Sequence, residues 1–137
     1  MAHSAGWTAL GDYIAGPEIL GFVFEYPRGY LECVAWGDRD FDAGGDGHVL
    51  AFLTKGEVAK ELKVFVREAT SKRLVPFARG DNGDALFCFD GDGGKEVYVI
   101  NLGDNPLCAR STGCTDFMGF INDYRSRMGL PKWMPGA

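Results

Sequence analysis

Two clusters of aspartate and glycine are the part of this sequence whose residue types and spacing could do chemistry. Asp38-Arg-Asp-Phe-Asp42 is followed by Ala-Gly-Gly-Asp-Gly47, and Asp90-Gly-Asp-Gly-Gly94 has a similar composition. Carboxylates at alternating positions occur in EF-hand calcium loops, which also need glycine at the sixth position and glutamate at the twelfth. Counted from Asp38, those positions hold Ala43 and Val49. We expect solvated acidic turns and no metal site; an irregular Ca²⁺ site is the alternative.

Acid-base and nucleophilic catalysis need more than these clusters offer. Paired carboxylates hydrolyse a bond only when they face one another across an enclosed pocket, and the tips of exposed loops do not provide one. The two histidines, His3 and His48, are accompanied by no G-x-S-x-G nucleophile motif. The glycines form neither a P-loop nor a G-x-G-x-x-G dinucleotide motif. We therefore expect a protein that is not an enzyme and binds no cofactor.

The four cysteines do not form a recognisable metal or redox motif. Cys33, Cys88, Cys108 and Cys114 include no C-x-x-C pair and no zinc-knuckle spacing. Cys33 and Cys88 lie inside apolar runs, where a reduced thiol behaves as a small hydrophobic side chain. We expect reduced, structural thiols.

Charge is distributed unevenly along the 137 residues, whose formal net charge is −5. Residues 1–53 hold eight acids and two bases, whereas residues 54–79 hold three acids and seven bases. Residues 80–109 are again acidic, with six acids and one base. Nucleic acid requires a basic face, so a basic protein is the expected partner. The absence of a long apolar run and of a signal-peptide pattern predicts a cytoplasmic protein that does not enter a membrane.

Acidic loops beside aromatic residues are typical of surfaces that bind basic proteins. Trp36 and Phe41 flank or interrupt the first acidic cluster, and further acids stand at the turns between later segments. The predicted partner-binding residues are Trp36, Asp38, Asp40, Phe41, Asp42, Asp46, Asp81, Asp84, Asp90 and Asp92.

These residues must be positioned by elements that the residue pattern predicts, beginning with the first half. Residues 7–15 have the spacing of a short helix that Gly16-Pro17 ends. Residues 19–26 and 30–36 are rich in β-forming side chains and predict a hairpin. Residues 48–53 predict a strand that runs into Thr54-Lys-Gly-Glu57, a capping box. Apolar residues at helical spacing then predict an amphipathic helix to Ala69.

The second half predicts three strands and a final helix. Residues 74–78 read as a strand whose Pro76 favours an edge position or the start of pairing. Asn82-Gly83 predicts a tight turn, and residues 85–89 and 97–100, apolar on both faces, predict central strands. Thr115 can cap a last helix that Gly129 ends. The order of elements predicts one domain, 1–137, of the α+β class, with a central, mostly antiparallel sheet and flanking helices.

Several pieces of the second half, in this order, resemble the SUKH superfamily. Its pattern is a strand of the type I/L-P-F-A, a Gly-Asp turn, a strand ending in Asp, a V-Y strand and a helix of the type S-F-x-x-F-L. The pieces here are residues 74–78, Gly83-Asp84, Phe89-Asp90, Val97-Tyr98, and Phe117 with Phe120-Ile121. Before residue 74 the resemblance is limited to Leu10-Gly-Asp-Tyr13, which lacks the family's proline, and to Gly44-Gly45.

The resemblance implies a SUKH-like α+β fold and a protein-binding role without catalytic residues. Bacterial members typically neutralise toxins delivered between competing cells, often nucleases or deaminases, and fungal relatives regulate cell-wall synthesis. The function expected here is an immunity protein that binds a cognate toxin domain and blocks its active-site cleft. A small metal- or ligand-binding domain that uses the Asp/Gly loops, and a regulatory protein-binding scaffold, are the alternatives.

Overall fold

The computed structural model describes residues 10–36, 50–80, 83–127, 129 and 131, and within them five antiparallel strands form one sheet. Each strand pairs with the next one along the chain, in the order β1-β2-β3-β4-β5. The chain is therefore of the α+β class, as the sequence predicts, and every described strand pair is antiparallel. The strands are β1 (Ala51–Phe52), β2 (Leu74–Gly80), β3 (Ala85–Asp90), β4 (Val97–Asn101) and β5 (Ala109–Ser111).

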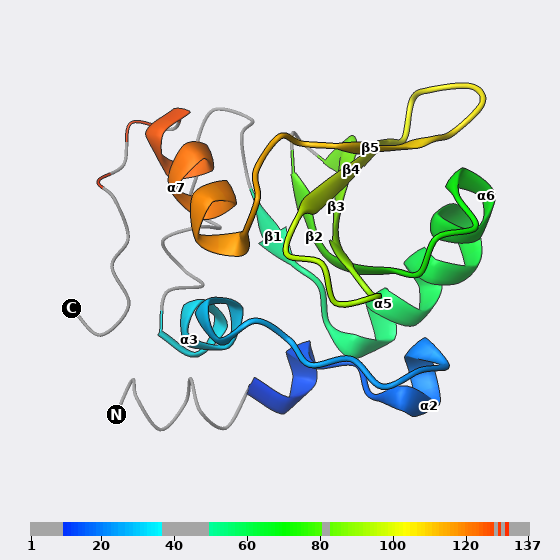
Figure 1. The fold of residues 1–137 in the computed structure, drawn as a ribbon, viewed down its shortest axis with the longest axis horizontal. Coiled ribbons are helices and arrows are strands. Elements are labelled where there is room, and N and C mark those ends of the chain that lie inside the picture. The colour runs from blue at the N-terminus through cyan, green and yellow to red at the C-terminus, as the bar shows by residue number, and fades with distance from the viewer. Residues whose placement is uncertain (1–9, 37–49, 81–82, 128, 130, 132–137) are drawn as a thin grey trace.

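Helices cover both faces of this sheet (Figure 1). One face is covered by α3 and α7, and the other by the continuous run of α5, η2 and α6. Of the helices in the described residues, none combines the length and the apolar composition needed to cross a membrane. The helical segments are η1 (Leu10–Tyr13), α2 (Pro17–Leu20), α3 (Arg28–Trp36), α5 (Lys55–Glu61), η2 (Leu62–Val66), α6 (Arg67–Ala69) and α7 (Phe117–Arg127).

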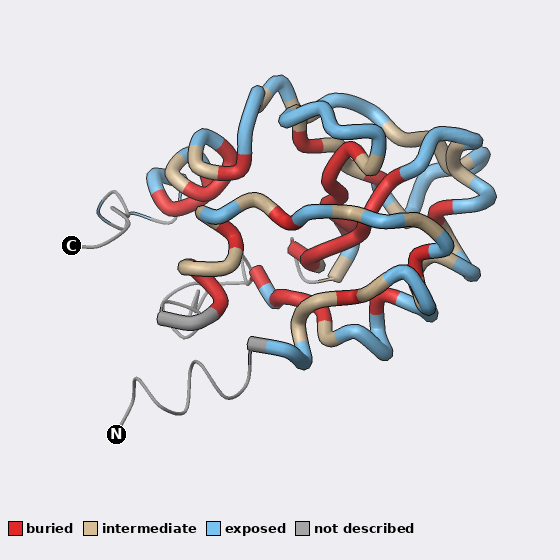
Figure 2. The backbone as a smooth tube through the Cα atoms, turned by 60° about the horizontal axis from the view of Figure 1, so that its bottom comes forward, coloured by how far each residue is buried: buried red, intermediate tan, exposed pale blue. Residues whose placement is uncertain are grey.

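Cover on both faces explains why β3 is buried at every position. Phe87 contacts Phe120 of α7 with ring centroids 4.7 Å apart. On the other face, Arg79 pairs with Glu61 at the end of α5. Figure 2 shows the buried positions gathered in the middle of the molecule, with loops and outer helix faces exposed. The predicted central position of β3 and β4 is confirmed, because both lie between other strands.

An aromatic cluster centred on Tyr30 joins α3 to the sheet. The Tyr30 ring is fully buried and packs against Phe77 and Phe89 of the sheet and Phe117 of α7, at centroid distances of 5.3–5.9 Å. Its hydroxyl donates to the Tyr13 carbonyl at 2.9 Å. A buried hydroxyl needs a hydrogen-bond partner, and here the partner belongs to η1. The bond therefore ties η1 to the core.

The hairpin predicted over residues 19–36 is wrong. Its second half is helix α3, whose buried residues Tyr30, Cys33 and Val34 follow helical spacing. Its first half begins in α2, whose C-cap Gly21 has φ +83°, and continues as a segment that pairs with none of the described strands. Of the helix predicted over residues 7–15, the described part is the 3₁₀ turn η1.

The capping box is confirmed. The Thr54 hydroxyl accepts from the Glu57 amide, and Glu57 Oε1 accepts from the Thr54 amide at 2.9 Å. The predicted helix follows and reaches Ala69, with a π-helical turn at η2 in which the Arg67 amide donates to the Leu62 carbonyl. The strand before the cap is shorter than predicted, since within the described residues it is β1 alone.

The second half follows its prediction with three corrections. Pro76 lies in β2, which pairs with β1 on one side and with β3 on the other, so β2 is not an edge strand. Pro76 itself is paired with β3 only, next to a shift in register, and lies outside the two residues of β2 that pair with β1. Asp116, not Thr115, caps α7, because its Oδ1 accepts from the Gly119 amide at 2.7 Å. The second half also contains a fourth strand, β5, where the residue pattern predicts three. Gly129 has φ +75°, as expected of a residue that follows a helix.

Candidate functional site

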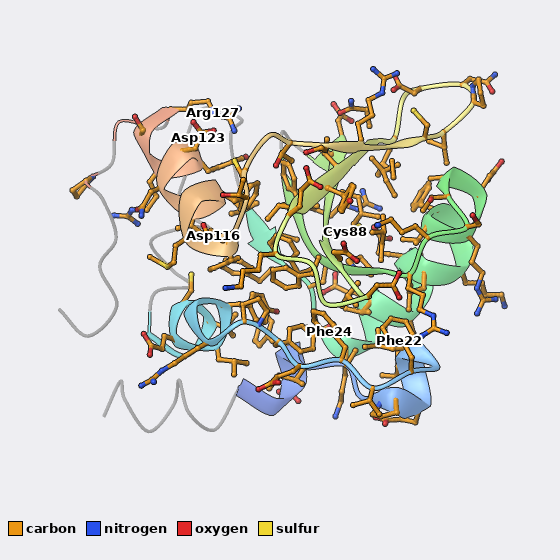
Figure 3. All side chains as sticks on the ribbon, viewed as in Figure 1. Phe22, Phe24, Cys88, Asp116, Asp123 and Arg127 are labelled. Carbon is orange, nitrogen blue, oxygen red and sulfur yellow. The ribbon has the colours of Figure 1, made fainter. Side chains whose placement is uncertain are left out.

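A pocket of about 350 Å³ opens where three separate segments meet. Its walls come from residues 24–29 before and at the start of α3, from the β3–β4 turn at residues 93–95, and from residues 116–118 at the start of α7. Phe24 and Asp116, from two of these walls, are labelled in Figure 3. This volume lies at the lower end of the range for ligand pockets and is large enough for one bulky side chain.

Aromatic side chains form the apolar lining of the pocket. Phe89 and Phe117 are each 3% exposed, and their ring centroids lie 5.9 Å apart. Phe24 stacks on Phe89 at 5.9 Å with an interplanar angle of 25°. Met118 adds a flexible thioether, a side chain that adapts to differently shaped partners. The pocket therefore offers apolar contact held by the core itself.

Charged side chains of both signs surround this lining. Arg28 pairs with Glu32 at 2.9 Å, and Asp116 caps α7, so both are already engaged within the protein. Glu25 and Lys95 are exposed, and neither forms an ion pair with another residue of the described chain. They are the rim charges available to a partner.

The β3–β4 turn that forms one wall is held in place by Asp90. This aspartate is 8% exposed, and its Oδ1 accepts from the Asp92 amide at 2.9 Å. Its Oδ2 lies 3.5 Å from Lys72 Nζ, and Arg73 accepts from the Gly91 amide at 2.7 Å through its carbonyl. A hydrogen bond with Tyr98, and then the Asp90 carboxylate, raise the pKa of Lys72. Asp90 is thus engaged in fixing the turn.

The structure brings few of the predicted partner-binding residues together. Asp92 is exposed on the β3–β4 turn, whereas Asp84 is exposed at the opposite end of β3, about 20 Å away along a six-residue strand. Trp36 is the last residue of α3, and its side chain lies outside the described residues. Asp38, Asp40, Phe41, Asp42, Asp46 and Asp81 also lie outside the described residues.

The pocket was not predicted from the sequence. The residue pattern predicts a hairpin strand over residues 19–26 and gives Met118 no role. A local pattern could not reveal the site, because its walls come from three segments spread between residues 24 and 118. The only sequence clue was the alternation in Phe22-Val-Phe-Glu-Tyr26, which is typical of an extended segment with one covered face.

The cysteines and acids offer no metal centre in the described part of the chain, where no group of three or more ligating side chains is found. The four cysteines, all within the described residues, form no disulfide, and Cys33 and Cys88 are buried. Burial, and to a smaller extent Glu61, raise the pKa of the Cys88 thiol. Cys88 lies on the sheet face that α5 and α6 cover (Figure 3), and its thiol is protonated at neutral pH.

Comparison with known proteins identifies no relative: no protein-family model, no curated protein and no solved structure matches the chain.

Proposed function

We propose that this chain is a protein-binding module that acts as a cytoplasmic immunity protein, binding a cognate toxin domain and covering its active-site cleft. The observation that carries the proposal is the pocket between the start of α3, the β3–β4 turn and the start of α7. It combines a rigid aromatic lining with exposed charges on its rim. Hot spots of protein interfaces have this composition, with an apolar anchor site surrounded by polar groups.

The order of the family-like pieces supports the immunity role. They fall in chain order on β2, the turn after it, β3, β4 and α7, with β5 between the last two. Two of them also contribute to the pocket, since Phe89 belongs to the β3 piece and Phe117 begins the α7 piece. SUKH-like immunity proteins act by binding, which is the activity that a pocket of this kind provides.

The acidic sequence supports a basic partner. The net charge is −5, and the Asp38, Asp40 and Asp42 run adds a dense negative segment. A nuclease toxin has a basic cleft for phosphates, and opposite charges accelerate association with it. Reversing these three charges together is expected to slow association and to weaken its dependence on salt. Unchanged kinetics would remove this run from the binding surface.

Growth protection tests the proposal directly. The proposal predicts a toxin domain encoded next to this chain's gene, and that domain is expressed in a sensitive host, alone and together with the full chain. We expect growth only in the co-expressing cells, a stable complex of the two purified proteins, and loss of toxin activity in that complex. Continued killing together with no complex at micromolar concentrations would contradict the proposal.

A further inference from the structure

The segment that joins α2 to α3 bends at Gly21 and Phe22, and its residues 22–26 form a strap with one covered face that belongs to no described helix or strand. Phe22 and Phe24 are half-buried and Tyr26 is buried, whereas Val23 and Glu25 between them are exposed. Val23 is 85% exposed, the most exposed large apolar side chain of the described residues. In Figure 1 the strap runs beneath the sheet between α2 and α3, and Figure 3 labels Phe22 and Phe24 on it.

Side chains, not backbone bonds, hold the strap against the protein. Phe24 packs on Phe89, and the Arg73 guanidinium lies 5.4 Å from the Phe22 ring centroid. The Tyr26 hydroxyl accepts from the Ala15 amide at 3.1 Å. The Gly21 amide and the Pro27 carbonyl, at the two ends of the strap, each bond within a neighbouring helical turn. Between them, no strap amide or carbonyl bonds to another backbone group of the described chain.

A backbone segment whose amides and carbonyls have no backbone partner in the described chain is a template for another extended segment. Each group needs a hydrogen-bond partner, which is water in the free protein and can be a second strand in a complex. Peptide recognition by strand addition uses such edges for affinity and adjoining pockets for specificity. The strap has both, because Phe24 and Glu25 also line the 350 Å³ pocket.

From this arrangement we infer that the strap is a docking edge for an extended segment of the partner protein, which adds to residues 22–26 as a strand and inserts one apolar side chain into the pocket. The inference rests on the proposed function and specifies how the partner is held.

The exposed residues of the strap define the chemistry of that segment. Side chains directly opposite one another in paired strands stand about 5 Å apart and on the same face. The residue opposite Val23 is therefore apolar, and the residue opposite Glu25 is lysine or arginine. The residue between them points to the covered face, where Phe24 borders the pocket, and is bulky and apolar. The partner segment therefore contains three consecutive residues: an apolar one, a bulky apolar one and a basic one. It can run parallel or antiparallel to the strap.

A displayed library of random eight-residue peptides, panned against the full chain, tests this inference. We expect enriched peptides to carry the tripeptide pattern and to slow amide hydrogen exchange at residues 22–26. Methylation of every second backbone nitrogen of the peptide, at the positions that face the strap, should weaken binding at least tenfold. It removes the peptide's N–H donors without changing its side chains. Glu25→Lys should weaken binding about tenfold, and exchanging the peptide's basic residue for glutamate should restore it. Glu18→Lys, a charge reversal on exposed α2, is the matched control and should change affinity less than twofold.

Three results would overturn the inference: no enriched peptide, peptides that protect another surface, or full affinity after methylation in both alternate registers. Concentration-dependent protection of the strap in the chain alone, with a dimer mass, would assign the edge to a second copy. The toxin complex separates the two proposals. Neutralisation without strap protection would reject the docking edge and keep the immunity role, whereas peptide docking without neutralisation would do the reverse.

Discussion

Removing one partner of the pair formed by Glu61 and Arg79 is predicted to cost more stability than breaking any exposed ion pair of the described chain. Arg79 Nε and Nη2 donate to the two carboxylate oxygens of Glu61, the second at 3.0 Å, and Nη1 donates to the Gly83 carbonyl at 2.7 Å. The Glu61 side chain is 5% exposed and that of Arg79 is 29% exposed. The partners stand eighteen positions apart, so the pair connects α5 to β2, and the bond to Gly83 extends the connection to the turn after β2.

Arg79→Met should lower the free energy of unfolding by about 3 kcal/mol, because it leaves a buried carboxylate without its counter-charge. The partial exposure of Arg79 keeps the loss at the lower end of the range for buried pairs. The double variant Glu61→Met with Arg79→Met should recover stability to within about 1 kcal/mol of wild type, since no uncompensated charge remains.

Urea unfolding at pH 7, followed by circular dichroism, measures these differences. Asp123→Asn is the matched control: its partner Arg127 lies 3.2 Å away, but the side chains are 58% and 61% exposed. It should cost at most about 0.5 kcal/mol. A loss below about 1 kcal/mol for Arg79→Met, or a double variant no more stable than the single one, would refute the reasoning.

Three further predictions concern the elements around the site. Thr54→Ala removes the cap of α5 and should cost about 1 kcal/mol in urea unfolding, whereas Thr54→Ser should cost less than half of that. Gly80→Ala should cost about 1–3 kcal/mol, because an added Cβ would lie 2.7 Å from the Phe87 ring; Gly11→Ala, where nothing lies within 4 Å, is its control. Burial, with smaller effects of neighbouring groups, raises the pKa of Tyr30 well above 10.0, so its neutral form contributes stability that is complete below about pH 10 and is lost as pH rises further. Tyr30→Phe should therefore lower the free energy of unfolding at pH 7 by about 1 kcal/mol through the lost hydrogen bond. It should also flatten the decline of that free energy between about pH 9.5 and 11. An equally steep decline in the variant would show that Tyr30 is not the group responsible.

Elements fixed by local chemistry were predictable from the sequence. The capping box sets the start of α5 through two reciprocal bonds, and a doubly apolar run such as residues 85–89 has few alternatives to a central strand. The segment from Tyr30 to Trp36 was not, because its β-forming residues also fit a helix that buries Tyr30, Cys33 and Val34. Tertiary packing decides between such alternatives, since β-propensity is a weak local preference.

The candidate site was harder to predict than the fold. Asp90 resembled a surface acid, but the turn it stabilises draws its carboxylate inward. The pocket depends on Phe24, Lys95 and Met118 meeting in space, and no spacing along the chain encodes that meeting. The acids selected from the sequence and the pocket found in the structure are therefore separate parts of the proposed interface.

The central claim is that the pocket anchors a protein partner, and the dissociation constant of the toxin complex tests it most directly. Met118 lines the pocket at the start of α7, where Met118→Glu places a carboxylate beside the aromatic lining and Met118→Leu keeps the site apolar. With both variants shown to be folded by thermal melting, we predict that Met118→Glu weakens binding about 30-fold or more, the effect of a hot-spot residue. Met118→Leu should stay within about threefold of wild type, as expected for an exchange that conserves volume. Equal affinity of the wild-type and Met118→Glu proteins for the toxin domain would contradict the claim.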